Sequence, residues 1–263
     1  MSTATLAPVG RESVFRNTLT IARRNLLHIK ANPEQLVEMS IQPLMFLVLF
    51  VYVFGGAIMG SSSRFLQFVL PGILVQGIAF TPFTTALGLN KDFQQGLIDR
   101  FRSLPIARSA VIGGRIAADS VRITWSVLVM VGFGVLLGFR FGNGVLGALG
   151  ALALVVAFGL TMCWPMAFIG ITAKSPESVN TWGFMIILPL TFASSAFVPP
   201  ETMPGWLEAF ATVNPISHVI DAARGLMLGD LPVAKPLLWS VLWLVGITAV
   251  FSSLTIARYR RRV

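Results

Sequence analysis

Few residues of this sequence have the types and spacing that chemistry needs. Asp119 and Arg122 lie three residues apart, which places both on one face of an expected helix. They stand at the start of an apolar stretch, where an ionisable side chain is a candidate for a direct role in function. The alternative is a structural or coupling pair near a membrane surface, where both charges can pair or extend to the interface. The sequence leaves both interpretations open.

The common sequence signatures of catalysis are absent. The chain contains no G-x-x-x-x-G-K-[ST] phosphate loop, no H-E-x-x-H zinc motif and no G-x-S-x-G nucleophile motif. Its two histidines (His28 and His218) are far apart in the sequence, and its one cysteine, Cys163, cannot form an intrachain disulfide. We therefore expect no catalytic residue, no metal site and no enzymatic activity from this chain alone.

The composition indicates that membrane-spanning helices position these residues. Hydrophobic residues make up 55% of the 263 residues and charged residues 12%, about half the charged content of a soluble domain. The net charge is +9, but the basic residues fall in short gaps between apolar runs, which is typical of charges that orient a membrane protein. The sequence therefore predicts an all-α integral membrane protein surrounded by lipids, and argues against a nucleic-acid partner.

Six apolar stretches are long enough to span a membrane, which takes about 20 residues. They cover approximately residues 39–59, 66–89, 117–138, 145–171, 179–198 and 236–257 of a transmembrane domain at 37–257. Residues 1–36 form a tail before this domain, and residues 258–263 form a basic tail after it. Most of the 20 Lys and Arg residues fall on the side of the two tails, so the positive-inside rule places both termini in the cytoplasm.

Two segments on the expected cytoplasmic side have the apolar spacing of a helix. Residues 14–29 form a basic amphipathic pattern, which predicts a helix in the membrane interface or, alternatively, a solvated helix packed on a partner. Residues 91–115 carry Phe93, Leu97, Phe101 and Leu104 at helical spacing, and this pattern ends near Pro105. This short surface helix between spans two and three either transmits a push from a cytoplasmic partner or is a charged loop that only fixes the topology.

The expected external segment between spans five and six also contains helical patterns. Residues 197–235 mix prolines with two short amphipathic pieces, around 204–210 and 216–229. We expect two short re-entrant helices that dip into the outer leaflet, with Trp206 as an anchor at the interface. A disordered loop is the alternative, and it fits poorly with so many apolar residues.

Spans two and five are free of charge in their interiors but rich in polar and aromatic residues. A cavity lined in this way would suit an amphiphilic, aromatic or lipid-like molecule, because ligand pockets are mostly apolar with a few polar groups. The alternative for each residue is a role in helix packing. The candidates for a substrate path are Gln76, Phe80, Phe83, Trp182, Phe184 and Phe192.

Two motifs resemble those of a known family. The first combines Asp99-Arg100-Phe101-Arg102-Ser103-Leu104-Pro105 with Arg108, Gly114-Arg115, Asp119 and Arg122. The second, in the external segment, combines Pro204, Trp206-Leu207, Asn214-Pro215, Arg224 and Gly229. Together they resemble daunorubicin-resistance-type permeases, which belong to the type-2 family of ATP-binding-cassette (ABC) exporters. Many members carry an acidic residue followed by a basic-Gly-Thr turn, whereas the corresponding stretch here runs from Asp92 through Phe-Gln-Gln-Gly to Leu97, which fits the drug-resistance branch better than the polysaccharide branch.

The resemblance implies a function and partners. The chain would be the permease half of an exporter in the bacterial cell membrane. Two copies, as a homodimer or a heterodimer with a second permease, would pair with two copies of a separate ATPase that holds ATP and Mg²⁺. The segment 92–105 would be the coupling helix in a cleft of that ATPase, with residues 99–105 as its coupling residues. The external motif would include Trp206, Asn214, Pro215 and Arg224.

The resemblance leaves the transported compound open. A hydrophobic drug or an amphiphilic, lipid-like compound is expected first. A polysaccharide, glycolipid or cell-wall precursor is the second reading. A third reading, an ATPase-independent channel or scaffold, leaves the helix at 91–105 without a role.

Overall fold

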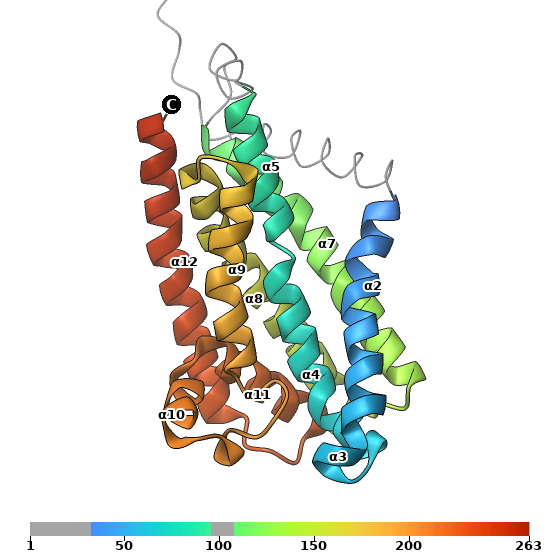
Figure 1. The fold of residues 1–263 in the computed structure, drawn as a ribbon. Helices are drawn as coiled ribbons and strands as arrows, with labels where there is room; N and C mark the ends of the chain where they lie inside the picture. The colour runs from blue at the N-terminus through green and yellow to red at the C-terminus, as the bar shows by residue number, and fades with distance from the viewer. Residues whose placement is uncertain (1–32, 96–107, 263) are drawn as a thin grey trace, which may run out of the picture.

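The computed structural model describes residues 33–95 and 108–262, and these residues form helices joined by short connections, with no strand among them. The all-α class is therefore as the sequence predicts. Residues 1–32, 96–107 and 263 lie outside this description. The helices, named as in Figure 1, are α2 (Pro33–Leu49), η1 (Phe50–Phe54), α3 (Gly55–Met59), α4 (Ser62–Phe80), α5 (Phe83–Gln94), α7 (Arg108–Leu136), α8 (Gly144–Thr172), α9 (Pro176–Phe192), η2 (Pro200–Thr202), α10 (Gly205–Val213), α11 (Pro215–Leu228) and α12 (Ala234–Arg262).

Within the described residues, five helical segments are long and apolar enough to cross a membrane. They are Ser40–Met59, Ser62–Gln94, Asp119–Leu136, Gly144–Thr172 and Ala234–Tyr259. The predicted fifth stretch, 179–198, corresponds to α9, which has 17 residues and ends at Phe192. At 1.5 Å per residue this helix is about 26 Å long, slightly less than the hydrocarbon thickness of about 30 Å. The six-span count therefore stays a prediction.

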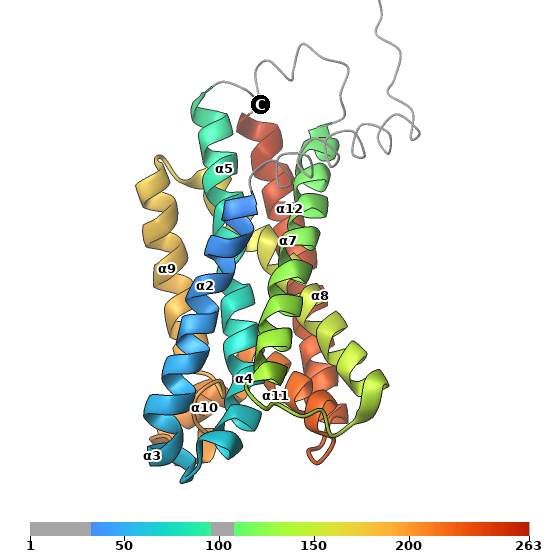
Figure 2. The same ribbon diagram turned by 90° about the vertical axis from the view of Figure 1, so that its right-hand side faces the viewer.

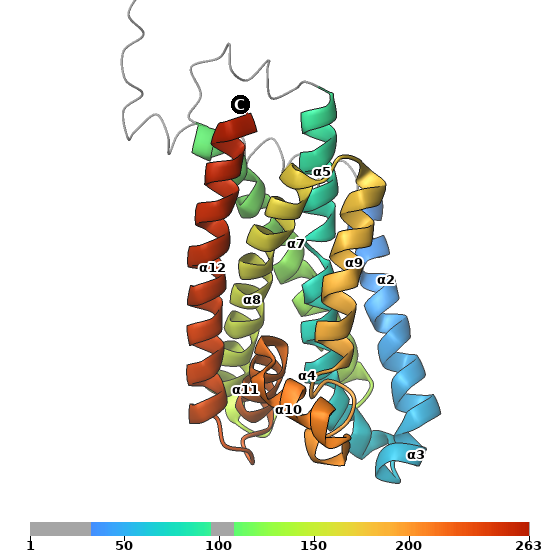
Figure 3. The ribbon, with the colours of Figure 1, turned by 60° about the vertical axis from the view of Figure 1, so that its left-hand side comes forward.

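The long helices form one bundle around α8. This helix contacts α4, α5, α7, α9, α11 and α12. Pro33 at the start of α2 and the C-terminal end of α12 lie at the same end of the bundle, whereas α3, α10 and α11 lie at the opposite end (Figures 1 and 2). Between these ends, α9 runs beside α8 and α5 (Figure 3). α4 is mostly buried, whereas α2, α9 and α12 present many large apolar side chains outward, as expected where lipid replaces water.

The second apolar stretch is one membrane-length segment made of two helices. α4 ends at Phe80 and α5 begins at Phe83, with Thr81 and Pro82 between them. Pro82 has no N–H, and its ring crowds the carbonyl one turn earlier, so the regular helical pattern is interrupted there. The backbone N–H of Thr81 instead donates to the Ile78 carbonyl at 3.2 Å, a tighter turn than the α-helix.

The segment after α9 is held by contacts from distant residues. The side chain of Asn214 donates to the carbonyl oxygens of Leu190 and Ala193, at 2.7 and 2.9 Å. These carbonyls have no partner further along α9 because the helix ends there. The Oδ1 of Asn214 also accepts the N–H of Ile216 at 2.9 Å and so caps α11, whose first residue is Pro215. One side chain therefore joins the end of α9 to the start of α11.

Several of the predicted features fall on residues outside the description. The N-terminal interfacial helix at 14–29 is one of them, and most of the coupling segment, including Asp99 to Pro105, is another. α7 begins at Arg108 and continues to Leu136 as one helix, so the chain enters the third apolar stretch directly from the basic region.

The backbone of α4 at Gly72 lies very close to the backbone of Ala196, and a substitution there tests how these two segments pack. A Cβ at this position would lie 2.3 Å from the Ala196 carbonyl oxygen and 2.7 Å from its Cα. We expect Gly72→Ala to lower the free energy of unfolding by about 1–3 kcal/mol, because the backbone must move to admit the methyl group. The apparent melting temperature of the purified protein in detergent measures this effect. Gly246→Ala on α12, where a Cβ meets nothing within 4 Å, is the matched control and should not lower it. Equal melting temperatures for the two variants would contradict this packing.

Candidate functional site

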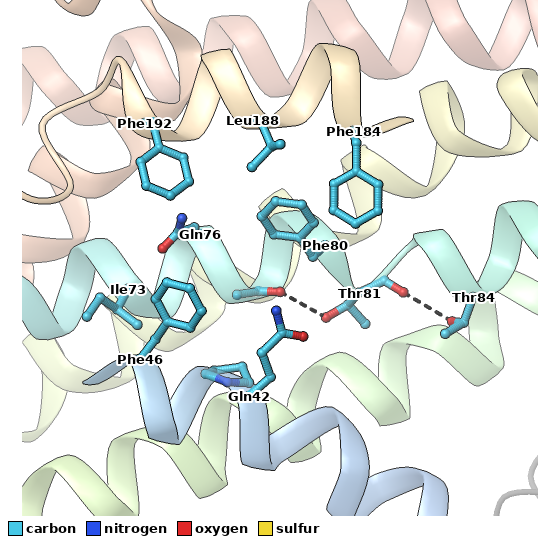
Figure 4. Close-up of a pocket in the computed structure, with 12 residues that line it drawn as sticks. Gln42, Phe46, Ile73, Gln76, Phe80, Thr81, Thr84, Phe184, Leu188 and Phe192 are labelled. Carbon is cyan, nitrogen blue, oxygen red and sulfur yellow. Dashed lines mark hydrogen bonds between the residues drawn. The ribbon is translucent and has the colours of Figure 1, made fainter. Parts of the chain in front are cut away.

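A hollow of about 310 Å³ lies between α2, the α4–α5 segment and α9 (Figure 4). α2 contributes one wall, the break between α4 and α5 forms the floor, and α9 borders the opposite side with three large apolar side chains that are themselves exposed (Figure 4). The residues around it are Gln42, Pro43, Phe46, Ile73, Gln76, Gly77, Phe80, Thr81, Thr84, Phe184, Leu188 and Phe192.

The structure brings together four of the six residues predicted to form a substrate path. Gln76, Phe80, Phe184 and Phe192 line the hollow. Phe83 does not line the hollow but packs against two residues that do. Its ring centroid lies 5.8 Å from that of Phe80 and 4.9 Å from that of Phe184. Trp182 is 56% exposed and does not line the hollow.

The contribution of α2 was missed by the sequence analysis. Gln42 and Phe46 line the hollow from the first apolar stretch, which was not considered as part of a path. A signal was present in the sequence. Gln42 is an amide within an apolar run, as Gln76 is in the second stretch. The residue pattern of one helix does not tell which neighbouring helix it faces. Only the structure shows that the first and second apolar stretches face each other across the hollow.

Aromatic rings continue from the hollow toward the end of the bundle that holds α3. The Phe192 centroid lies 5.2 Å from that of Phe197, and Phe197 lies 4.6 Å from Phe50. Phe50 in turn lies 5.9 Å from Phe46 and 5.2 Å from Phe54. These separations are typical of favourable aromatic pairs, so the rings form a continuous apolar surface.

The polar groups around the hollow are few and uncharged. The hydroxyls of Thr81 and Thr84 donate to the carbonyls of Gly77 and Thr81 at 3.4 and 3.1 Å, so both are already engaged by backbone (Figure 4). The two glutamine amides remain as the polar side-chain groups of the lining. A pocket of this kind can hold an apolar or aromatic molecule and orient it through few hydrogen bonds.

The predicted pair Asp119 and Arg122 joins three helices rather than lining the hollow. Arg122 donates to Oδ1 of Asp119 at 3.0 Å, and Oδ2 of the same carboxylate accepts a hydrogen bond from the Thr85 hydroxyl. The Cys163 sulfur of α8 lies 4.0 Å from the same oxygen. Asp119 is 1% exposed. Its contacts tie α7 to α5 and α8, which agrees with the structural or coupling interpretation.

A second group of contacts fixes α5 near the end of the bundle that holds the C-terminus. The Asn90 amide donates to the carbonyls of Gly170 and Ala173 at 3.0 and 2.9 Å, where α8 ends. Gln94 donates to the Lys174 carbonyl at 3.1 Å. α5 is therefore held to the turn between α8 and α9 just before residues 96–107, whereas Asp119 holds α7 further along that helix, which begins at Arg108.

At the end of the bundle that holds α3, α10 and α11, Arg224 of the external motif joins several segments. This side chain is almost fully buried and donates to the carbonyls of Phe68 and Ser195 and to Oδ1 of Asp221, at 3.1, 2.8 and 3.0 Å. Its guanidinium lies 3.9 Å from the centre of the Phe68 ring. Burial lowers the pKa of Arg224 to about 10, and the Asp221 carboxylate opposes that fall, so the side chain remains charged near neutral pH. It thus joins α11 to α4 and to the segment after α9.

The other members of the external motif have different surroundings. Trp206 on α10 is 76% exposed, and its role as an anchor at the interface stays a prediction. His218 stacks on Trp239 with ring centroids 5.9 Å apart, and burial lowers the pKa of His218. Both rings border a second hollow of about 720 Å³ between α10, α11 and α12. Among the described residues, no group of three or more His, Cys, Asp or Glu side chains could hold a metal ion.

Substitution of Arg224 tests whether its three contacts hold α11 in place. We expect Arg224→Lys to lower the free energy of unfolding by about 1–3 kcal/mol, because an ammonium cannot reach all three acceptors and leaves buried oxygens unpaired. Thermal unfolding of the purified protein measures the change. Arg64→Lys is the matched control, because Arg64 is exposed. If both lysine variants unfold at the wild-type temperature, Arg224 does not act as the joint between α11 and α4.

Comparison with known proteins agrees with these features. The family model described as "ABC-2 type transporter" matches residues 16–228. The "Daunorubicin resistance ABC transporter permease protein DrrB1" of Streptomyces coeruleorubidus is 38% identical over 257 residues, which cover 96% of this chain and 89% of that protein.

Two further relatives come from Mycobacterium tuberculosis. The "Probable doxorubicin resistance ABC transporter permease protein DrrC" is 30% identical over 222 residues, which cover 83% of this chain and 79% of that protein. The "Doxorubicin resistance ABC transporter permease protein DrrB" is 26% identical over 264 residues, which cover 94% of this chain and 91% of that protein. The chain belongs to the ABC-2 type transporter family, because the family model matches most of its length and its relatives share this identity over most of the chain.

Proposed function

We propose that this chain is the membrane subunit of an ATP-driven exporter that moves hydrophobic or amphiphilic compounds out of the cell. Membership of the family supports a permease role, and the names of three relatives refer to daunorubicin or doxorubicin resistance. The observation that carries the proposal is the hollow lined by aromatic rings between α2, α4–α5 and α9. Its size and apolar surface suit a small aromatic or amphiphilic compound better than a sugar chain.

The proposed topology has six spans, with α9 as the fifth. α8 ends and α9 begins at one end of the bundle, and α10 and α11 follow α9 at the other end, so the chain passes along the bundle within α9 (Figure 1). Ser194, Ser195 and Ala196 continue the segment and are fully buried. With both tails in the cytoplasm by the positive-inside rule, α10 and α11 are external and reach into the outer leaflet.

The proposed driver is a separate ATPase that binds the coupling segment Asp99–Pro105. α5 and α7 flank this segment, and both are tied to the rest of the bundle, by Asn90 and Gln94 on one side and by Asp119 on the other. A movement of the segment would therefore be passed to α5 and from there to the α4–α5 break at the hollow. Two permease copies and two ATPase copies complete the transporter, with ATP and Mg²⁺ on the ATPase.

Charge reversal in the coupling segment tests this arrangement. We expect Arg102→Glu and Asp99→Arg each to weaken co-purification of the ATPase about tenfold or more, because each places a like charge against its partner at a docking surface. Quantitative pull-down and drug efflux from cells measure the loss, and membrane insertion should be unchanged.

Arg258→Glu is the matched control for charge reversal. Arg258 is exposed on α12 at the same end of the bundle but outside the coupling segment. This variant should retain the ATPase. Unchanged efflux and unchanged co-purification in both Arg102→Glu and Asp99→Arg would contradict the coupling role.

Filling the hollow tests its role in transport. We expect Leu188→Trp to abolish most efflux while the ATPase still co-purifies, because the larger ring occupies space that the compound needs. Ile186→Trp, two residues earlier on α9, is the control, because Ile186 is exposed and does not line the hollow. Efflux from cells expressing each variant, normalised to the amount of complex, is the measurement. Wild-type efflux by Leu188→Trp would show that compounds take another route.

A further inference from the structure

Gln76 is an exception among the buried charged and amide side chains of the described residues. In the described part of the chain, the buried side chains that carry a charge or an amide are Gln76, Asn90, Asp119, Asn214 and Arg224. Each of the last four forms hydrogen bonds with other groups of the protein. The amide of Gln76 has no hydrogen-bond partner among the described residues, although the side chain is only 6% exposed.

The unpaired amide points into the hollow. Figure 4 shows the end of Gln76 between the rings of Phe46 and Phe192, with the amide of Gln42 reaching toward the same space from α2. Gln42 likewise has no side-chain hydrogen bond to the described residues. An amide in an apolar environment without a partner costs about 2–7 kcal/mol on hydrocarbon transfer scales. The buried Gln76 amide therefore marks a place where a molecule with matching polar groups is stabilised, and the exposed Gln42 amide lies at the same hollow.

The remaining lining restricts what that molecule can be. None of the twelve lining residues carries a charge, and the threonine hydroxyls already donate to backbone carbonyls. A permanently charged compound would lose its hydration there without gaining a carboxylate or a guanidinium as a partner. The rings of Phe46, Phe80 and Phe184 offer flat apolar contact instead.

We propose that Gln76, assisted by Gln42, selects uncharged aromatic compounds that carry carbonyl or hydroxyl groups. A primary amide both donates and accepts, so its N–H groups meet a ligand carbonyl and its oxygen meets a ligand hydroxyl. The inference rests on the proposed function and deepens it, because it assigns the hollow a substrate class and names its specificity-determining residues.

Three probes with the same ring system test the selection. They are 9-fluorenone, which carries a carbonyl, fluorene, which has no polar group, and a trimethylammonium derivative of fluorene, which is permanently charged. Equilibrium dissociation constants are measured on the complex with its ATPase in lipid nanodiscs, for the wild type, Gln76→Leu and Gln42→Leu. The same probes are assayed for ATP-driven export.

The expected result is a loss specific to the carbonyl compound. Gln76→Leu should raise the Kd of fluorenone about five- to tenfold, the effect of one lost hydrogen bond, and leave the Kd of fluorene unchanged or lower. Comparison of variants with one probe removes the contribution of its partition into lipid. The charged probe should bind more weakly than fluorenone to the wild type.

Gln67→Leu is the matched control on the same helix. The Gln67 side chain lies outside the hollow, where it donates to the Gly138 carbonyl and accepts the Arg140 N–H. This variant should keep the wild-type Kd for all three probes. An equal rise for fluorenone in Gln67→Leu and Gln76→Leu would show that the effect is not local, and would overturn the inference.

Two further outcomes separate the inference from the proposed function. If ATP drives export of both fluorenone and fluorene with no difference between Gln76→Leu and wild type, or if the charged probe binds most tightly, the selection is wrong and the exporter role stands. If no probe or drug is exported and the partner ATPase does not bind, the proposed function itself is wrong.

Discussion

A chain that spans hydrocarbon must satisfy its polar groups from within, because no water is available to do so. In the described part of the chain, four of the five buried charged or amide side chains meet that requirement by bonding to backbone carbonyls or to side chains of other helices, and the fifth, Gln76, faces the hollow instead. Asn90 bonds to the carbonyls at the end of α8, Asn214 to those at the end of α9, and Arg224 to those of α4 and the segment after α9. These contacts stabilise the helix ends and set where the helices lie relative to one another.

The same contacts hold α5 and α4 at different ends of the bundle. Thr85, Asn90 and Gln94 fix α5 to helices at the end of the bundle with the C-terminus. Arg224 and the close approach at Gly72 fix α4 to the opposite end. The break at Thr81 and Pro82 joins the two helices and lies beside the hollow. The hollow therefore lies where α4, fixed at one end of the bundle, meets α5, fixed at the other.

Features that depend on a single helix, such as the bounds of a membrane-spanning stretch, could be predicted from the sequence. The stretch at 145–171 is uninterrupted and apolar, and α8 spans Gly144–Thr172. The stretch at 179–198 is also apolar, yet α9 ends at Phe192, and Asn214, more than twenty residues away in the sequence, bonds to the carbonyls at its end. Gln76 and Phe184 were found from the content of spans two and five, whereas Gln42 was missed because its neighbours across the hollow depend on how α2 packs. Interactions between distant segments are what the sequence alone does not contain.

The central claim is that compounds pass through the hollow between α2, α4–α5 and α9 under the control of a separate ATPase. The most direct measurement is a structure of the permease and ATPase complex with an exported compound bound, determined in lipid nanodiscs. We predict density for the compound between Phe46, Phe80 and Phe184, with residues 99–105 seated in the ATPase. A compound bound elsewhere in the bundle, with this hollow filled by side chains or lipid and the ATPase docked on other residues, would contradict the account.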